Sequence, residues 1–494
     1  MQSKSRDKRH NILSYWIILL ALSLAIPLHA QEWDTVWTKT YGWMNVDCAY
    51  AVAVDSEGYY IVGGYTWSDT TGEDLLIYKI EPTNGDTVWS KTYTIGRFFY
   101  QRAYSIAVDA ENHYIVGGQY DDSLLLGFWD FWILKLDSAT GDTLWAKSYG
   151  YGNNNIDWVY SVAIDSQGYY IVTGPHQVNG GTCCWVLKLN PEDGDTVWSK
   201  EYWKGAPAEK PNSVAVDSQH YYVVTGVIRN NNWGTWDLLL VKLNPIDGDT
   251  LWTKTYGGVD NYIGWAASID HQGYYVVAGH TDSLGSYDVW VLKIDPANGD
   301  TVWTKTYGGG LNDYGLSVAV NSQGDYIVAG MTYSYGAGGC DAWVLKIDHT
   351  NGDTLWTKTY GGALYDRANA IAIDPQGYYI IGAETYSFGA GDEDMWVLKL
   401  KGTSTGVEEG YSLTDFSVTI PSIVTKELAI SVNLPYGSLI SLKIYDVLGR
   451  LVYKENKMLS SGHHKMMVVL PQGIYFVNLS IGQRTIKKKV VVLR

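Results

Sequence analysis

The sequence is poor in the groups on which several common protein classes depend. Its four cysteines, in a chain of 494 residues, are too few for a disulfide framework. It contains no HExxH or GxSxG motif and no glycine loop of the kind that holds phosphate, and its ten histidines form no cluster with ligand spacing. The turn sequence DPANGD has its oxygens at the wrong spacing for an EF-hand. We therefore expect no metal and no cofactor.

Basic residues are scarce between residues 31 and 411. This part holds 21 basic and 47 acidic side chains, and 14 of the basic ones are lysines repeated at fixed places. A protein that binds nucleic acid neutralises phosphates with lysine and arginine. Nucleic acid is therefore excluded as an expected partner.

Long apolar runs are absent after the first thirty residues. The run WIILLALSLAIPL follows Lys4, Arg6, Lys8 and Arg9 and is followed by LHA, which predicts a signal peptide over residues 1–30. The alternative is an uncleaved anchor, but the run is shorter than the roughly 20 residues that span a bilayer. We expect cleavage and no integral membrane segment in the mature protein.

What the chain does have is a repeat. The tetrapeptide DTVW or DTLW recurs at intervals of 51 to 56 residues, with its tryptophan at Trp37, Trp89, Trp145, Trp198, Trp252, Trp303 and Trp356. Each unit contains four runs that alternate with period two, for example 316–320, 325–332, 342–348 and 353–360. Turn sequences such as DSQG and DHTNG separate them. Four antiparallel strands per unit predict the blades of a β-propeller.

The ends of the repeat predict how the ring closes. The first DTVW run, 34–41, has no unit before it, and the last MWVLKL run, 395–400, has no DTVW run after it. We expect the N-terminal strand to complete the last of seven blades and so leave no open edge. The fold class is therefore all-β, with a seven-bladed β-propeller over residues 31–400.

The repeated tryptophans and lysines are expected to serve the fold. Burying a large apolar side chain contributes roughly 1.5–3 kcal/mol, so seven tryptophans between blades would hold the ring together. The lysines of the VLK and TKTY runs are expected to lie on solvated or ion-paired strand faces. A role in ligand binding is not needed to explain either set.

The propeller part resembles a known family. The unit WVLKID–NGDTLWTKTYGG, followed by AIAIDPQGYYIIG, is similar to the seven-bladed β-propeller repeat family of bacterial exported proteins over about residues 34–400. Members range from enzymes to scaffolds, so the resemblance implies a fold and no single function. The segment LDSATGDTLW also resembles the tryptophan-docking hairpin of quinoprotein propellers, some of which carry a disulfide between adjacent cysteines. Cys183 and Cys184 could form such a bond. This chain has seven repeat units, whereas those quinoproteins usually have eight, which argues against a quinone cofactor.

The last part of the chain differs in composition. Residues 412–494 have a net charge of +7 and no tryptophan, against −26 for residues 31–411, which predicts a second domain after a linker at 401–411. The segments KIYDVLGRLVYK, LPQGIYFVNLSIG and KKKVVVL resemble the C-terminal sorting domain of the type IX secretion system. The matching motif residues are Asp446, Gly449, Arg450, Gly473, Tyr475, Lys487, Lys488 and Lys489.

That resemblance implies a small immunoglobulin-like β-sandwich and a partnership with the secretion machinery. It also implies export, so that the protein is secreted or lies at the cell surface, and such domains are commonly removed afterwards. A generic adhesive β-sandwich is the alternative interpretation of these strands. The alternating runs and glycine turns of the tail agree with a sandwich independently.

One face of the propeller is the candidate binding face. Hairpin turns repeat almost unchanged on one side, whereas the connections on the other side differ in every unit, and propeller function usually resides on such loops. The candidate ligand-binding residues are Trp43, Trp67, Trp129, Trp158, Trp203, Trp233, Trp236, Trp265, Asp121, Asp122 and Arg97. Aromatic surfaces beside amides and carboxylates suit sugar rings, so we expect non-catalytic recognition or adhesion of a glycan or a protein.

Two alternatives stay open for this face. The aromatic residues could pack the long loops without binding anything. A secreted polysaccharide-active hydrolase could use paired carboxylates on the same face, although aspartate is too frequent here for a pair to be informative. The sequence does not name the ligand.

Overall fold

The structure is a computed structural model of the whole chain, and it divides into two compact units, Met1–Thr403 and Ser404–Arg494. The residues that it describes are 35–42, 46–94, 99–121, 129–150, 157–178, 181–202, 209–230, 234–282, 285–402, 417–419, 423–424, 427–434, 438–447, 449–459, 462–481 and 484–493. The predicted signal peptide, 1–30, lies outside these residues, as does most of the predicted linker, 401–411. Within the described ranges, no helix is long and apolar enough to cross a membrane.

The described residues of the first unit form seven sheets, each with four strands paired antiparallel, which are numbered in chain order. Sheet 1 contains β2 (Asp47–Val54), β3 (Tyr60–Ser68), β4 (Gly72–Ile80) and β5 (Thr87–Tyr93), with β6 (Phe99–Tyr100) beside β4. Sheet 2 contains β7 (Arg102–Val108), β8 (Tyr114–Asp121), β9 (Trp129–Leu136) and β10 (Thr143–Tyr149). Sheet 3 contains β11 (Ser161–Ile164), β12 (Tyr170–Val178), β13 (Gly181–Leu189) and β14 (Thr196–Tyr202).

The remaining sheets of this unit repeat the same order. Sheet 4 contains β15 (Glu209–Val216), β16 (Tyr222–Arg229), β17 (Trp236–Leu243) and β18 (Thr250–Tyr256). Sheet 5 contains β19 (Tyr262–Ile269), β20 (Tyr275–Thr281), β21 (Asp288–Ile294) and β22 (Thr301–Tyr307). Sheet 6 contains β23 (Asp313–Val320), β24 (Tyr326–Thr332), β25 (Asp341–Ile347) and β26 (Thr354–Tyr360). Sheet 7 contains β27 (Asp366–Ile373), β28 (Tyr379–Thr385) and β29 (Asp394–Leu400).

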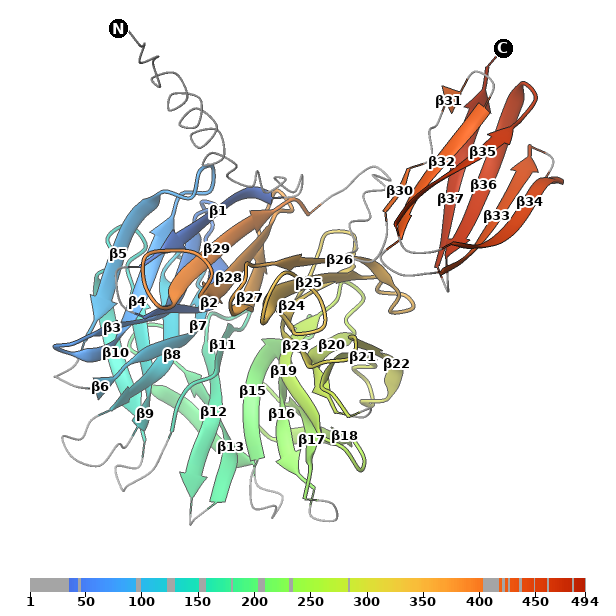
Figure 1. Cartoon of the computed structure of the whole chain (residues 1–494). Coiled ribbons are helices and arrows are strands. Elements are labelled where there is room, and N and C mark those ends of the chain that lie inside the picture. Colours follow the sequence, from blue (N-terminus) through green and yellow to red (C-terminus); the bar gives the residue numbers. More distant parts are fainter. Residues whose placement is uncertain are drawn as a thin grey trace, which may run out of the picture. The chain divides into compact units, whose positions relative to one another are not determined.

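The N-terminal strand completes sheet 7, as the sequence predicts. Strand β1 (Thr35–Tyr41) pairs antiparallel with β29, and Figure 1 shows this dark blue strand beside the orange one. The first strands of consecutive sheets lie against one another from β2 through β7, β11, β15, β19 and β23 to β27, which in turn lies against β2. Repeated four-stranded sheets with this arrangement are consistent with a β-propeller.

Local turn chemistry explains why each unit folds as hairpins. In the first hairpin of sheet 1, the Asp55 carboxylate accepts the backbone N–H groups of Glu57 and Tyr59, which closes the DSEG turn. The turn ends at a residue with positive φ, where glycine has no steric penalty. Sheets 2 and 4 instead place Asn112 (φ 68°) and His220 (φ 71°) at this position.

A buried tyrosine, aspartate and lysine join neighbouring sheets. Tyr222 of sheet 4 is fully buried and donates through its hydroxyl to Asp165 Oδ2 of sheet 3 at 2.7 Å. Lys188 of the VLK run lies 3.0 Å from the same carboxylate oxygen. The equivalent trios at other boundaries include Tyr60–Asp374–Lys399, Tyr114–Asp55–Lys79, Tyr170–Asp109–Lys135, Tyr275–Asp217–Lys242 and Tyr326–Asp270–Lys293. The VLK lysines are thus ion-paired, which was one of the two alternatives expected. Six of them are buried, and the seventh, Lys346, is partly buried and pairs with Asp325.

The repeated tryptophans pack between sheets, as predicted. Trp198 of sheet 3 donates to the backbone oxygen of Pro245 in the last turn of sheet 4 at 3.4 Å, and its ring lies 6.1 Å from that of Tyr222. On the same strand, Lys200 of the TKTY-type run pairs with Asp249 of sheet 4 at 2.8 Å on the surface. One DTVW strand therefore contributes a packing contact and an ion pair to the next sheet.

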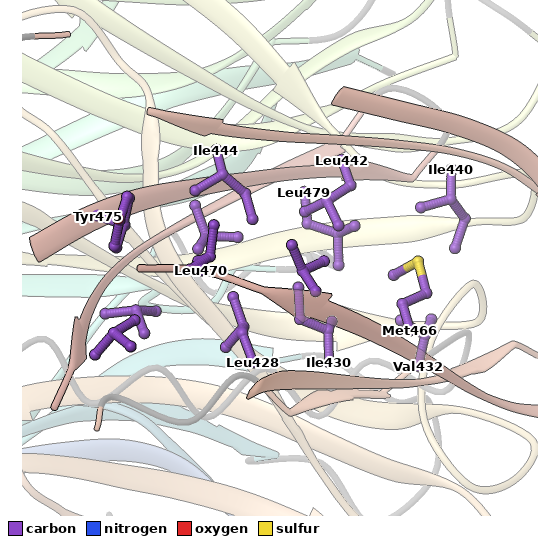
Figure 2. Packing of buried hydrophobic residues seen from close by; sticks show 14 of the residues in the cluster. Leu428, Ile430, Val432, Ile440, Leu442, Ile444, Met466, Leu470, Tyr475 and Leu479 are labelled. Carbon is purple, nitrogen blue, oxygen red and sulfur yellow. The ribbon is translucent and has the colours of Figure 1, made fainter. Parts of the chain in front are cut away.

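The second unit has two sheets that share one core. One sheet contains β30 (Ser417–Thr419), β32 (Glu427–Leu434) and β35 (Gly462–Val469). The other contains β31 (Ile423–Val424), β37 (Arg484–Val492), β36 (Gly473–Ile481), β33 (Ser438–Asp446) and β34 (Leu451–Leu459). Figure 2 shows Leu428 and Ile430 of the first sheet packed against Leu442 and Leu479 of the second. Alternate residues of each strand supply this core, as expected for two facing sheets.

Candidate functional site

A β-bulge recurs in the first strand of the sheets and sets the geometry of the variable face. The register shifts between Ala49 and Ala51 in β2 and between Ala103 and Ser105 in β7, and also in β15, β19, β23 and β27. The bulged residues at these places are Tyr50, Tyr104, Asn212, Trp265, Leu316 and Asn369. A bulge leaves one residue outside the ladder and redirects its side chain.

Several of the bulged residues contact residues of the neighbouring first strand or the residue just before it. The rings of Tyr50 and Tyr104 stack at 5.4 Å, and Tyr104 meets Tyr160 edge-on at 5.7 Å. Amides take the place of rings at two other boundaries, where Asn212 donates to the Gly264 oxygen and Asn369 donates to the Ala49 oxygen. These side chains therefore line the place where the first strands of the sheets meet.

The aromatic contacts continue outward along sheets 2 and 3. Trp158 lies 5.8 Å from Tyr160 and 5.6 Å from Trp129, in both cases edge to face. All five rings from Tyr50 to Trp129 are partly exposed. We call the group Tyr50, Tyr104, Tyr160, Trp158 and Trp129 the aromatic row.

Two arginines flank this row, and each has a carboxylate partner. Arg102 pairs with Glu73, where its Nη2 donates to Oε1 at 2.7 Å, and its guanidinium lies 4.6 Å from the ring centre of Tyr65. Arg367 approaches Glu384 at 3.6 Å. Burial raises the pKa of Glu384; Arg367 opposes that shift and the nearby Glu393 adds to it.

Carboxylate pairs at this end of the sheets are buried. Asp341 and Asp366 flank Gly361, and the Gly362 N–H donates to Asp366 Oδ2 at 2.8 Å. Burial raises the pKa of Asp341 to about 6, and the charge of Asp366 adds to the shift. Asp288 and Asp313 flank Gly308 in the same way, and burial together with Asp313 raises the pKa of Asp288. These pairs brace glycine turns inside the protein.

The structure brings together some of the predicted binding residues and not others. Trp129 and Trp158 are in contact, whereas Trp67 is 39% exposed at the end of β3. Trp236 begins β17 and lies under the ammonium of Lys210 at 5.9 Å. Trp265 donates to His280 Nδ1 at 3.0 Å, and burial lowers the pKa of His280 to about 4. Lying outside the described residues are Trp43, Trp203, Trp233, Asp122, Arg97 and the side chain of Asp121.

Sequence reasoning missed the three tyrosines of the aromatic row. A signal for them exists in the runs AYAVAV, AYSIAV and VYSVAI, where Tyr50, Tyr104 and Tyr160 occupy one repeat position that is Asn212 or Trp265 elsewhere. Their contacts could not be read from the sequence because bulges in β2 and β7, and not simple alternation, direct Tyr50 and Tyr104 to the place where the first strands meet, and Tyr160 lies just before β11.

Two groups in the described residues have side chains close enough to hold a metal ion. They are Cys48, Glu384 and Glu393, all buried, and Asp109, Glu111 and His113 at a hairpin turn. Asp109 already pairs with Lys135 and accepts the Tyr170 hydroxyl. All four cysteines of the chain are buried and free, including Cys183 and Cys184.

The sorting-motif residues of the second unit build a tight turn and a strand end. Gly449 has a φ of 76°, and Arg450 donates from Nε to Asp446 Oδ2 at 2.7 Å. Gly473 begins β36, and the Tyr475 hydroxyl donates to the Pro471 oxygen at 3.0 Å. Lys487, Lys488 and Lys489 lie in β37.

Family models match both units. The model described as outer membrane protein assembly factor BamB matches residues 73–380, and that of the secretion system C-terminal sorting domain matches residues 421–493. No curated protein matches the sequence.

Solved structures resemble the chain at low identity. PorZ, a surface component of the type IX secretion system of Porphyromonas gingivalis, is 14% identical with a TM-score of 0.47, over 92% of this chain and 60% of that chain. The extracellular domain of BT4673 from B. thetaiotaomicron is 14% identical with a TM-score of 0.42, over 93% and 60%. Sqt1 of Chaetomium thermophilum is 9% identical with a TM-score of 0.43, over 75% and 98%. The chain thus spans 60% of the length of the first two.

Proposed function

Because the chain belongs to the repeat family described as outer membrane protein assembly factor BamB and ends in a type IX sorting domain, we propose that it is an exported glycan-binding protein built on a seven-bladed propeller. The sorting domain makes the protein one that is secreted or displayed at the cell surface. Our proposal concerns the function of the protein at that location. Recognition belongs to the first unit, and the second unit, proposed to be an immunoglobulin-like sandwich, engages the secretion machinery.

The aromatic row is the observation that carries the proposal. Five partly exposed rings follow one another across three sheets, from Tyr50 to Trp129. Tyrosine and tryptophan combine a large apolar surface with a polar group, which suits a ligand that has both. A pyranose ring presents C–H faces to such a surface and hydroxyls to neighbouring polar groups. The row therefore favours a saccharide over a purely apolar ligand.

The charges beside the row favour a neutral saccharide. The guanidinium groups of Arg102 and Arg367 already lie near Glu73 and Glu384. Because their charges are compensated, they can donate single hydrogen bonds to hydroxyls without attracting a strongly anionic chain. The surrounding propeller has a large acidic excess, which also disfavours anionic glycans.

The hydrolase alternative receives less support from the described residues. Their carboxylate pairs, such as Asp341 with Asp366, are buried and bonded to backbone N–H groups. A glycosidase needs two carboxyl groups that reach the scissile bond. Binding without catalysis is therefore the function that we propose.

A glycan array with the purified protein tests the proposal. We expect Tyr104→Ala to lower affinity for the bound glycan at least tenfold, about 1.4 kcal/mol, because it removes the ring that links Tyr50 to the rest of the row. Tyr335→Ala is the matched control, since this tyrosine is 40% exposed in a loop of sheet 6 outside the row. Equal binding by parent and Tyr104→Ala would contradict the proposal, and cleavage of an arrayed glycan would support the hydrolase.

A further inference from the structure

At several boundaries between sheets, three side chains meet on the variable face. They come from the end of the second strand, from the residue at the start of the third strand, and from the first strand of the next sheet. Between sheets 1 and 2 they are Tyr65, Glu73 and Arg102. We call such a group a boundary triad.

Boundary triads elsewhere in the described residues are complementary. Arg102 neutralises Glu73 and covers the ring of Tyr65. Between sheets 5 and 6 the triad is His280, Tyr287 and Tyr314, whose rings lie 4.8 to 5.4 Å apart. Between sheets 2 and 3, Trp129 and Trp158 are in ring contact.

The triad that joins sheet 7 to sheet 1 is different, because it consists of Glu384, Glu393 and Cys48. The three side chains are 5%, 8% and 1% exposed, and their ligand atoms all lie within 4.8 Å of one another. Cys48 occupies the position in sheet 1 that Arg102 occupies in sheet 2. The carboxylate of Glu73 pairs with Arg102, whereas the equivalent carboxylate of Glu393 contacts the thiol of Cys48. This boundary is also the one at which the two ends of the repeat come together.

We propose that Cys48, Glu384 and Glu393 bind a divalent transition-metal ion, with Zn²⁺ as the best fit, that locks sheet 7 to sheet 1. A thiolate donor selects zinc-like ions, since Ca²⁺ and Mg²⁺ take oxygen ligands. One divalent ion together with Arg367, 3.6 Å from Glu384, balances the negative charges of one thiolate and two carboxylates. A buried group of like charges without such a partner would be costly.

The surroundings of the triad orient its ligands. The Tyr386 hydroxyl donates to Glu393 Oε2 at 2.6 Å, and Asn369 donates to Glu384 Oε2 at 3.1 Å. The backbone also links the two sheets here, because the Asp47 N–H donates to the Glu393 oxygen at 2.9 Å. Hydrogen bonds of this kind hold metal ligands in position in known sites.

Titration of the purified, EDTA-treated protein with Co²⁺ and then Zn²⁺ tests the site. We expect one equivalent of Co²⁺ to give a sulfur-to-cobalt charge-transfer band, Zn²⁺ to displace it, and Zn²⁺ to raise the unfolding temperature by several degrees. Cys48→Ser should abolish the band. Cys340→Ser, which removes another buried cysteine near the same face, should keep it.

Two outcomes would overturn the inference. One is the absence of both the band and the temperature shift in the parent protein, which would leave the triad as a thiol–carboxylate hydrogen-bond network. The other is an unchanged band in Cys48→Ser, which would place the metal on another cysteine. Should Cys48→Ser fail to fold by circular dichroism, Glu384→Gln keeps the thiol and is expected to weaken Zn²⁺ binding at least tenfold; unchanged affinity would contradict the site.

Discussion

At the scale of single residues, the tyrosine hydroxyls between sheets differ in the charge of their acceptors. Tyr275 donates to the carboxylate of Asp217 at 2.7 Å. Tyr379 instead donates to the Gly402 oxygen and accepts from Asn321, because asparagine replaces aspartate in sheet 6. Hydrogen bonds to charged groups contribute roughly 1.5–3 kcal/mol, against about 1 kcal/mol for neutral ones.

We therefore expect Tyr275→Phe to lower the free energy of unfolding by about 1.5–3 kcal/mol, because it leaves the buried Asp217 without this donor. Tyr379→Phe, the matched control, should cost only about 1 kcal/mol. Urea unfolding followed by tryptophan fluorescence measures both. Equal losses would mean that the charge of the acceptor does not matter.

A second residue-scale prediction concerns pH. The folded-state pKa of Asp341 is raised to about 6, above its usual 3.8, by burial and by Asp366. The folded protein therefore holds this proton between about pH 4 and 6, and the stability that it contributes is lost as the pH rises through 6. Asp341→Asn removes this dependence and should stabilise the protein at pH 8 by roughly 2–3 kcal/mol more than at pH 4. Parallel curves of unfolding temperature against pH for parent and variant would contradict it.

At the scale of elements, two hairpin turns of sheet 3 use glycine at positive φ in different surroundings. Gly168 has a φ of 88°, and a Cβ added there would meet no atom within 4 Å. Gly194 has a φ of 74°, and a Cβ added there would lie 2.9 Å from the Trp145 ring of sheet 2. The first turn therefore needs glycine for its backbone alone. The second needs it also for docking the neighbouring tryptophan.

Gly168→Ala should cost about 1–2 kcal/mol, the usual penalty of a left-handed conformation. Gly194→Ala should cost roughly 1–3 kcal/mol more, because its methyl group would overpack Trp145. Thermal unfolding of the two variants side by side gives the difference. An equal loss in both would show that the turn can move away from the tryptophan.

The strands of sheet 6 also show which features of an element the sequence pattern predicts and which it does not. Alternation and turn residues predicted the four runs of sheet 6 almost as they are, from 316–320 to 353–360, because neighbouring residues decide strands and tight turns. The β-bulge at Leu316 was not predicted, since the register also depends on which strand lies alongside. For the same reason the sequence pointed to Trp158 as a binding residue but not to Tyr160 or Tyr104.

At the scale of the whole molecule, β1 connects the last sheet of the repeat to the first. It pairs with β29 of sheet 7, while Trp37 and Tyr41 donate to the Pro82 and Gly85 oxygens of sheet 1. A chain that begins at residue 42 should therefore lose more than about 3 kcal/mol of stability, because it lacks the buried Tyr41 and the partly buried Trp37, and removal of one aromatic core side chain alone costs roughly 3–5 kcal/mol. A chain that begins at residue 33 keeps β1 and is the control. Equal unfolding temperatures for the two chains would contradict the role of β1.

The sequence by itself determined the strands, the turns, the place of the N-terminal strand beside the last one and the export of the protein, because each follows from neighbouring residues, from the two ends of the repeat or from a terminal motif. Only the tertiary structure decided that six of the VLK lysines are buried against Asp55 and its equivalents, that Tyr50, Tyr104 and Tyr160 belong to one row, and that Cys48 faces Glu384 and Glu393. Lys79 lies 24 residues from Asp55 within one sheet, whereas neighbouring tyrosines of the row lie 54 and 56 residues apart and Cys48 lies 345 residues from Glu393. The first contact depends on how the strands of a sheet pair and the others on how the sheets pack, and no local pattern encodes either.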